Sequence, residues 1–233
     1  MTLLRSVLFA LALVVVTPPY ALLALASFPL PRMARYRLIS AWSRLVIWLA
    51  WLLCGIRWKV EGRRHLPDEP AVILSQHQSA WETLAFQEIF PPQVHVLKRE
   101  LLWIPFFGWG LALMSPIAIN RSRGMAALRE MARQGRERLA QGFWVVIFPE
   151  GTRVAPGERR DYQQGGAWLA AQCGVPVVPV AHNAGRLWPR NAFLKRAGTV
   201  TVRIGPPIPT AGRDAKDVNA ETRAWIEGQQ QSL

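Results

Sequence analysis

Acidic residues are scarce in this sequence. It holds 15 Asp and Glu against 28 Lys and Arg, so the formal net charge is +13. This imbalance suggests an anionic partner, namely a phospholipid surface, a phosphorylated substrate or a nucleic acid. We expect no nucleic-acid partner, because the arginines are spread along the chain and no groove-binding motif is present.

Cysteine is also rare, and repeats and low-complexity linkers are missing. The two cysteines, Cys54 and Cys173, argue against a disulfide framework. No Cys/His spacing of the zinc type occurs, so we expect no metal site. With 233 residues, of which 51% are hydrophobic, the chain can form one domain with a sizeable core.

Charge is absent from residues 6–31, which are apolar apart from an interruption at Pro18-Pro19. A connector with three arginines follows, and a second apolar segment extends from about residue 38 to residue 56. This second segment carries three tryptophans and Arg44. We therefore predict that residues 1–56 form an N-terminal membrane-associated helical segment.

Three arrangements of this segment fit the pattern. A signal peptide fits because Arg5 would be its basic end and Ala24-Leu25-Ala26 has the small-x-small cleavage pattern. Two full spans fit by length, although the prolines weaken the first. We favour a hairpin that bends at Pro18-Pro19 and enters only one leaflet, with Arg5 and the basic connector on the same aqueous side.

Short apolar runs alternate with helical periodicity from residue 57 onward. Strands are expected at residues 58–61, 71–74, 94–97, 117–119, 144–147, 175–180 and 199–204, and helices at about 81–89, 122–141, 162–173 and from 214. This alternation predicts an α/β domain over residues 57–233, with a mixed, mostly parallel sheet flanked by helices. His95 alternates with valines and is interpreted as structural.

Two segments of this domain are unusual. Residues 103–110 are aromatic, and their Pro and Gly discourage a regular helix. We expect these rings either in the core or along a groove for an apolar chain, because they are too many for a surface loop. The strand at 175–180 contains Pro176 and Pro179, which are unsuited to a central ladder, and we interpret it as scaffold.

The turn between the strand at 71–74 and the next helix is the strongest candidate for chemistry. Across this turn, the carboxylate of Glu82 can reach one imidazole nitrogen of His77 and leave the other as a base. A structural interpretation stands beside it, because Ser79-Ala80-Trp81-Glu82 fits the S-x-x-E capping box. The two interpretations are compatible.

Two more blocks follow strands. Asn120-Arg121 ends a short strand, and Phe148-Pro149-Glu150-Gly151-Thr152-Arg153 follows the strand at 144–147. A glycine after a strand lets backbone N–H groups approach an anion, and arginine can bind phosphate with two hydrogen bonds. These blocks therefore favour a phosphorylated substrate.

Taken together, the blocks resemble those of the membrane glycerolipid acyltransferases, and most closely the bacterial 1-acyl-sn-glycerol-3-phosphate acyltransferase family. That family shows, in order, a His and an acidic residue separated by four positions, an arginine block, a Phe-Pro-Glu-Gly-Thr-Arg block and a Val-Pro-x-x-Pro-Val block. This sequence has all four, at His77–Glu82, Ile119–Arg121, Phe148–Arg153 and Val175–Val180. One departure is Glu82, where the family usually has Asp.

The resemblance implies transfer of a fatty acyl group from an acyl thioester to the sn-2 hydroxyl of 1-acyl-sn-glycerol-3-phosphate (lysophosphatidic acid), which gives phosphatidic acid. The co-substrate would be acyl-CoA or acyl carrier protein, with no other cofactor. His77 would be the general base and Glu82 would orient it. The residues expected to bind the acceptor are Lys98, Arg121, Glu150, Gly151, Thr152 and Arg153.

Such a reaction takes place at a membrane, so phospholipids are expected partners. Since acyl donors are made in the cytoplasm, we expect the inner membrane with the active site facing the cytoplasm, which argues against a signal peptide. Three alternatives stay open. They are an acyltransferase for another lysolipid such as lyso-ornithine lipid, a non-catalytic membrane lipid-binding protein, and a hydrolase that uses Ser79.

Overall fold

A single seven-stranded sheet organises the computed structural model, which describes the backbone of residues 1–233 and every side chain except that of Arg121. The strands are β1 (Ile56–Glu61), β2 (Val72–Ser75), β3 (Gln93–Lys98), β4 (Ile117–Ile119), β5 (Trp144–Ile147), β6 (Val177–His182) and β7 (Gly198–Ile204). Their order is β1-β7-β6-β2-β5-β3-β4. Only the β6–β7 pair is antiparallel, so the predicted mixed, mostly parallel sheet is confirmed.

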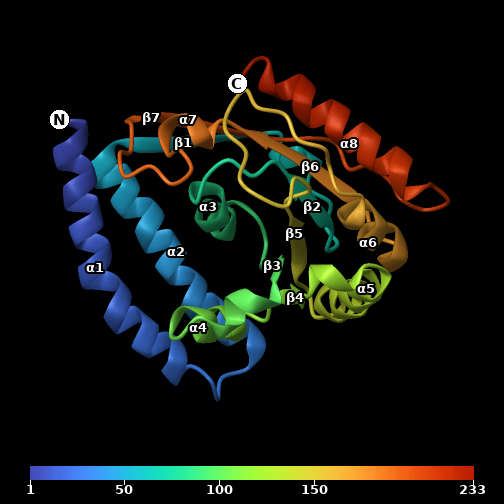
Figure 1. The fold of residues 1–233 in the computed structure, drawn as a ribbon, viewed down its shortest axis with the longest axis horizontal. Helices are drawn as coiled ribbons and strands as arrows, with labels where there is room; N and C mark the ends of the chain where they lie inside the picture. Colours follow the sequence, from blue (N-terminus) through green and yellow to red (C-terminus); the bar gives the residue numbers. More distant parts are fainter.

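Helices cover both faces of the sheet (Figure 1). They are α1 (Thr2–Ala26), α2 (Arg32–Cys54), α3 (Trp81–Ile89), α4 (Phe107–Leu113), α5 (Met125–Ala140), α6 (Gly165–Cys173), α7 (Ala184–Leu187) and α8 (Ala215–Gln230), with short 3₁₀ turns η1 (Arg63–His65), η2 (Arg99–Trp103) and η3 (Arg121–Arg123). Alternation along the strands separates two cores. Ile73 packs on the side of α2 and α3, whereas Val72 and Leu74 pack on the side of α5, α6 and α8.

Pro176, just before β6, and Pro179, within it, do not move this strand to an edge, contrary to expectation, since β6 lies between β7 and β2. Its antiparallel ladder with β7 begins at Val180, one residue beyond Pro179. The Pro179 carbonyl still accepts a hydrogen bond from the Gly205 N–H at 2.9 Å. The missing N–H of Pro179 therefore falls beyond the ladder with β7, where it costs no hydrogen bond.

The expected bend at Pro18-Pro19 is wrong, because α1 continues through both prolines. Contacts with α2 flank them: the Tyr20 hydroxyl donates to the Leu38 carbonyl at 2.8 Å, and the Trp42 indole N–H donates to Thr17 Oγ1 at 3.3 Å. These bonds stabilise a helix that isolated proline propensity would interrupt. The chain reverses instead between α1 and α2.

This turn places Arg5 and the basic connector at opposite ends of α1, not on the same side as expected. A helix of 25 residues is about 37 Å long. At the connector end, Arg32 forms an ion pair with Glu137 of α5 at 2.9 Å, and Arg35 donates to the Leu113 carbonyl of α4 at 2.8 Å. The hairpin is thereby fixed to the α/β domain at its turn.

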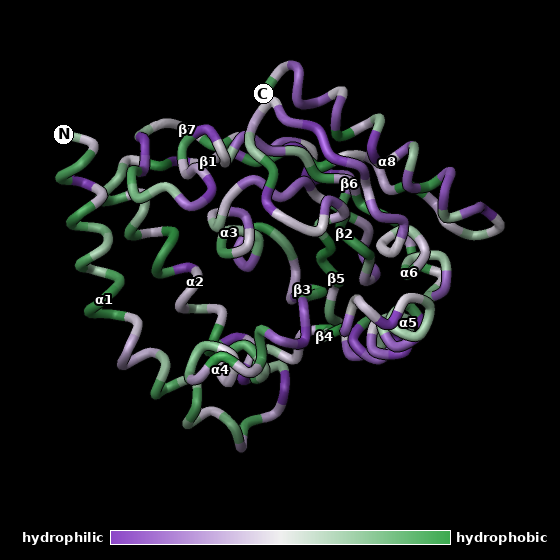
Figure 2. Tube along the Cα trace, in the orientation of Figure 1, coloured by the Kyte–Doolittle hydropathy of each residue, from purple (hydrophilic) through white to green (hydrophobic). Residues whose placement is uncertain are grey.

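The two N-terminal helices differ in their surroundings. Both are long and apolar enough to cross a membrane, a property that core helices and signal sequences share. α2 buries side chains along its whole length, from Tyr36 to Cys54, against the domain. α1 lies outside α2 and is hydrophobic along most of its length (Figure 2). It exposes leucines and valines, such as Leu11 and Val14. This exposed apolar surface indicates membrane association.

The aromatic block at residues 103–110 lies outside the core, which was one of its two expected positions. Its last four residues form the first turn of α4, a helix that its Pro and Gly were expected to discourage, and its large rings lie on the surface. Trp103 is 67% exposed and Phe106 is 63% exposed. Because α4 packs beside α1 and α2, these rings extend the apolar surface of α1 and are not part of the core.

Candidate active site

The predicted site residues gather at one edge of the sheet, where the parallel strands β2, β3, β4 and β5 end. His77 follows β2, Lys98 ends β3, and Glu150 follows β5. Arg121 follows β4, but its side chain lies outside the described residues. The carboxyl ends of parallel strands form the usual binding edge of an open α/β sheet, so the topology itself assembles this site.

His77 and Glu82 form a hydrogen-bonded pair at this edge. His77 Nδ1 lies 2.8 Å from Glu82 Oε1. The Glu82 side chain is 0% exposed, whereas that of His77 is 16% exposed. Among the described residues, His77 Nε2 has no hydrogen-bond partner, so this nitrogen is available to accept a proton.

Glu82 also closes the start of α3. Its Oε1 accepts the backbone N–H groups of Gln78 at 2.9 Å and Ser79 at 2.7 Å, and Ser79 Oγ accepts the Trp81 N–H at 3.0 Å. Glu82 therefore both caps the start of the helix and contacts the imidazole of His77. Ser79 is fully buried and its oxygen is engaged, which argues against its use as a nucleophile.

The surroundings of the buried Glu82 side chain keep it ionised, as a carboxylate. Burial alone would raise its pKa, but the neighbouring imidazoles of His182 and His77 and the Ser79 N–H outweigh burial, and the pKa is lowered. An ionised Glu82 favours a proton on His77 Nδ1 and therefore a free lone pair on Nε2. The pair is thus electrostatically prepared to take a proton from a hydroxyl group.

Glu150 contacts the backbone of His77. Its Oε2 accepts the His77 N–H at 2.5 Å, and four residues later the Val154 N–H donates to the His77 carbonyl at 2.7 Å. Gly151 turns the chain with a φ of 70°, a value that favours glycine. Burial, with the nearby Glu82 charge, raises the pKa of Glu150 to about 8, so this carboxyl is neutral near pH 7.

Two cations at the edge have no partner among the described residues. Arg153 is half-buried, and only its carbonyl is engaged, by Arg190 Nη1. Lys98 is exposed on β3, two strands from β2. Thr152 lies half-buried between Gly151 and Arg153. The structure brings His77, Glu82 and Glu150 into direct contact, whereas Lys98 shares the edge without touching them.

Phe148 and His95 are neighbours of the site that sequence reasoning did not place there. The Phe148 ring stacks on the His77 imidazole, with centroids 4.1 Å apart and an angle of 13° between the planes. The ring centroids of His95 and Phe148 lie 6.0 Å apart. Burial lowers the pKa of His95 to about 4, so it is neutral, and its Nε2 is buried without a partner among the described residues.

His182, which the sequence analysis missed, supports the turn from the neighbouring strand. It is fully buried. Its Nε2 donates to the Gln76 carbonyl at 3.0 Å, and the Gln76 amide donates to the His182 carbonyl at 2.6 Å. The available signal was the position of His182 at the end of a buried strand, where it meets the end of β2.

Gln78, on the other side of His77, is held by two further elements. Its Oε1 accepts the Gly185 N–H at 3.2 Å, and its Nε2 donates to Gln230 of α8 at 3.3 Å. Gln230 in turn donates to the His182 carbonyl at 2.9 Å. The residues on both sides of His77 are therefore fixed by β6, α7 and α8.

The chemistry available to this site is proton transfer beside an anion. Within the described side chains, His, Cys, Asp and Glu form no group of three that could hold a metal ion. The structure instead offers an oriented imidazole and nearby cations. Such a site can activate a hydroxyl group on an anionic substrate, which places the protein in the class of α/β group-transfer enzymes.

Comparisons with known proteins agree with this class. The family model described as Acyltransferase matches residues 57–183. A 1-acyl-sn-glycerol-3-phosphate acyltransferase of Pseudomonas aeruginosa is 46% identical over 227 residues, which cover 95% of this chain and 88% of that protein. The chain therefore belongs to the acyltransferase family, and the resemblance drawn from its motifs is confirmed.

More distant relatives give the same result. The human 1-acyl-sn-glycerol-3-phosphate acyltransferase beta is 36% identical over 169 residues, which cover 71% of this chain and 61% of the human protein. The crystal structure of the 1-acyl-sn-glycerophosphate (LPA) acyltransferase PlsC from Thermotoga maritima matches all of this chain and 95% of that one, with a TM-score of 0.79 at 23% identity. That structure confirms the fold, including the two N-terminal helices.

Proposed function

We propose that this protein transfers a fatty acyl group from an acyl thioester to the sn-2 hydroxyl of 1-acyl-sn-glycerol-3-phosphate, giving phosphatidic acid. The observation that carries the proposal is the 2.8 Å contact between His77 Nδ1 and the buried Glu82. The relatives that are 46% and 36% identical are 1-acyl-sn-glycerol-3-phosphate acyltransferases, which supports the same acceptor. An alcohol that attacks a thioester needs a base, and this pair supplies one.

The reaction balances with these two side chains. As the acceptor hydroxyl attacks the thioester carbonyl, His77 Nε2 takes its proton and Glu82 stabilises the imidazolium. The C–O bond forms, the C–S bond breaks, and the imidazolium returns the proton to the leaving thiolate. No acyl-enzyme is required, because the thioester is already an activated donor.

The acceptor phosphate would be held by the cations of the same edge. Arg153 and Lys98 have no other partner among the described residues, and the family resemblance adds Arg121. Arginine binds phosphate with parallel hydrogen bonds. A neutral Glu150, buried against His77, fits this role because it adds no negative charge beside the phosphate, and Gly151 and Thr152 would line the acceptor.

We further propose that the enzyme attaches to one leaflet of the inner membrane with its active site facing the cytoplasm. α2 packs along its whole length against the domain, so a spanning hairpin would draw the domain into the bilayer. α1 and the rings of Trp103 and Phe106, next to the α4 helix that packs beside α1, offer exposed apolar surface. Cleavage after Ala26 would remove Phe9, which is buried in the core, so the signal-peptide arrangement is disfavoured.

Product analysis of the purified enzyme in mixed micelles tests this function. Given an acyl-CoA or an acyl carrier protein as donor and 1-oleoyl-glycerol-3-phosphate as acceptor, we expect phosphatidic acid by mass spectrometry. Arg153→Ala should raise the acceptor KM by about tenfold or more with a smaller change in kcat, because one charged hydrogen bond contributes about 1.5–3 kcal/mol. Equal rates with monoacylglycerol, and no effect of Arg153→Ala, would instead indicate a phosphate-free acceptor.

A further inference from the structure

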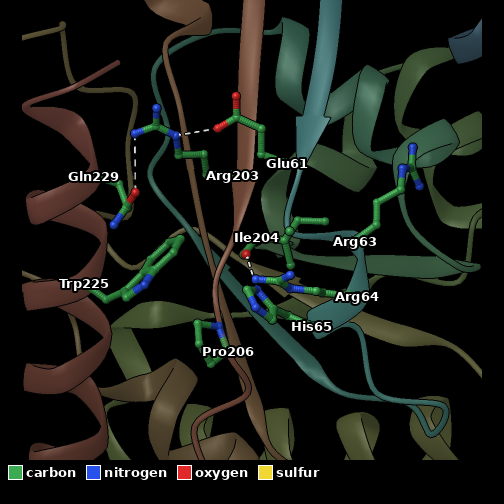
Figure 3. A pocket seen from close by; sticks show the side chains of 10 residues that line it. Glu61, Arg63, Arg64, His65, Arg203, Ile204, Pro206, Trp225 and Gln229 are labelled. Carbon is green, nitrogen blue, oxygen red and sulfur yellow. Dashed lines mark hydrogen bonds and ion pairs between the residues drawn. The ribbon is translucent and has the colours of Figure 1, made fainter.

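A second basic cavity lies away from the His77 site. It has a volume of about 550 Å³ and is formed by β1, η1, β7 and α8 (Figure 3). Its lining includes Arg64, His65, Arg203, Trp225 and Gln229, and none of the residues assigned above to acyl transfer. Its volume is in the range of small-molecule sites, about 300–1,000 Å³.

The cavity opens on the face of the sheet opposite to α2 and α3. Val202 and Ile204 of β7 belong to the core on the α2 and α3 side, so Arg203 between them points to the face covered by α8. Its position there is fixed by contacts with Gln229, in the last turn of α8, and with Ser232, just beyond the end of that helix. Because α1 packs in the core on the α2 and α3 side, this cavity and α1 lie on different faces of the sheet.

Positive charge dominates the cavity. Glu61 is the carboxylate of its lining, and it is already shared by Arg203 at 2.7 Å and Lys59 at 2.7 Å. Arg63 donates to the Ile89 carbonyl at 3.0 Å. Arg64 makes no hydrogen bond or ion pair with a described residue, so its guanidinium is available to a ligand.

The walls are held in place before any ligand binds. Gly62 has a φ of 82°, and a Cβ there would lie 2.1 Å from the Ile204 carbonyl oxygen. The His65 Nδ1–H donates to that same oxygen at 2.8 Å. A Cβ on Gly205 would lie 2.6 Å from the Trp225 ring. Two glycines thus allow the η1 turn and the indole to approach β7 closely.

We propose that this cavity binds a soluble phosphate ester that carries a planar group, such as a nucleotide. The phosphate would lie between Arg64 and Arg203, and the planar group would pack on Trp225. Guanidinium groups bind phosphate with strong charge-assisted hydrogen bonds, and an indole offers a flat apolar surface for a base. Figure 3 shows Trp225 and Arg64 on opposite sides of the cavity.

Isothermal titration calorimetry on the full chain in detergent micelles tests this site. The probes are adenosine 3′,5′-bisphosphate and inorganic pyrophosphate. We expect the nucleotide to bind about tenfold or more tightly than pyrophosphate. Arg64→Glu should weaken both probes by about tenfold or more, since it replaces a charged donor with a like charge. Trp225→Ala should weaken only the nucleotide.

Two variants control the experiment. Arg129→Glu changes the charge equally at an exposed position of α5 and should leave both affinities unchanged. Arg153→Ala removes a cation of the acyl-transfer site and should not affect nucleotide binding. The proposal is overturned if neither probe binds, if Arg64→Glu binds as the wild type does, or if Arg153→Ala abolishes binding. Acyl transfer by Arg64→Glu, measured separately, should stay at the wild-type rate.

Discussion

At the scale of single residues, Glu82 performs two tasks with one oxygen. The same Oε1 accepts from the Gln78 and Ser79 N–H groups and contacts His77 Nδ1. A side chain at this position must therefore reach the start of the helix and the imidazole together. This double contact explains why the length of the acidic side chain matters here, although the family usually has Asp.

We predict that Glu82→Asp lowers kcat by about 10²-fold, because the shorter side chain cannot keep both contacts and a displacement of about 1 Å costs that much. Glu82→Gln keeps the length but loses the charge that stabilises the imidazolium, so it should also be slow. Steady-state kinetics checks both variants, with thermal unfolding as the control for folding. A wild-type kcat in Glu82→Gln would show that the charge of this side chain is not needed by His77 and that the residue serves only the helix start.

Glu150 makes stability depend on pH. Burial raises its pKa to about 8 in the fold, above the ordinary value of 4.5. Between about pH 4.5 and pH 8, the folded protein therefore binds one more proton at Glu150 than the unfolded chain does. Its contribution to the free energy of unfolding is complete below about pH 4.5 and is lost as pH rises to about 8.

His95 has the opposite effect in part of this range. Its pKa is lowered from 6.5 to about 4 by burial, so its contribution is present above pH 6.5 and is lost as pH falls toward 4. Between about pH 6.5 and pH 8, the contribution of His95 to stability is constant and only that of Glu150 changes. We predict that urea unfolding in this window shows a falling stability for the wild type and a flatter profile for Glu150→Gln. Parallel profiles would contradict a raised pKa for Glu150.

The residues of the site were predictable to different degrees. The pairing of His77 with Glu82 follows from local sequence, because both lie on one turn. The inclusion of Glu150 in the site followed from the family resemblance, whereas its contact with the His77 backbone required the order of the strands. The roles of His182 and Gln230, and the stacking of Phe148 on His77, were not predicted, since these contacts depend on neighbouring strands and a helix that no local pattern specifies.

At the scale of elements, α8 reaches back to the catalytic turn. Gln230, at the last position of this helix, bonds to Gln78 and to the His182 carbonyl. A Cβ on Gly185 would lie 2.8 Å from Gln78 Cβ, so α7 is also tightly packed on the turn. The end of α8 therefore helps to position His77 from 153 residues away in sequence.

We predict that Gln230→Ala lowers kcat several-fold and leaves the acceptor KM nearly unchanged, because the loss of about 1 kcal/mol per hydrogen bond affects the geometry of the base and not the phosphate contacts. Gln231→Ala is the matched control, since the neighbouring glutamine is exposed. Kinetics of both variants on the same micelles decides the matter. Equal rates for the two variants, or a change confined to KM, would refute a positioning role for Gln230.

The elements of the α/β domain were predictable because the signals are local. All seven strands occur within two residues of their expected ends, since short apolar runs bounded by turns define them. The path of α1 through Pro18-Pro19 was not predictable, because it depends on hydrogen bonds from α2. The helix α4 was missed for the same reason: α1 and α2 support it.

At the scale of the whole molecule, the apolar surface and the active site must serve one membrane. The outer side of α1 and the rings next to α4 form this surface. Their exposure conflicts with a soluble protein but suits contact with lipid. The sequence indicated attachment from composition, whereas the position of these rings beside α1 required the folded structure.

We predict that replacing Trp103, Phe106 and Phe107 together by Ser reduces binding to vesicles of anionic phospholipid, above all at high salt. Under these conditions the basic surface is screened and the buried apolar area must hold the protein. Vesicle flotation at low and high salt measures the effect. Unchanged flotation at high salt would mean that these rings lie outside the membrane.

The most direct test of the central claim is thiol release from acyl-CoA by the purified enzyme in lipid micelles, with and without 1-acyl-glycerol-3-phosphate. We expect release that depends on the acceptor and that falls by about 10²–10⁴-fold in His77→Ala, the usual contribution of a general base. Should acyl-CoA fail, acyl carrier protein is the donor to test next. Undiminished release by His77→Ala, or release of free fatty acid without acceptor, would contradict the assignment of His77 and Glu82 as the base that activates the hydroxyl group.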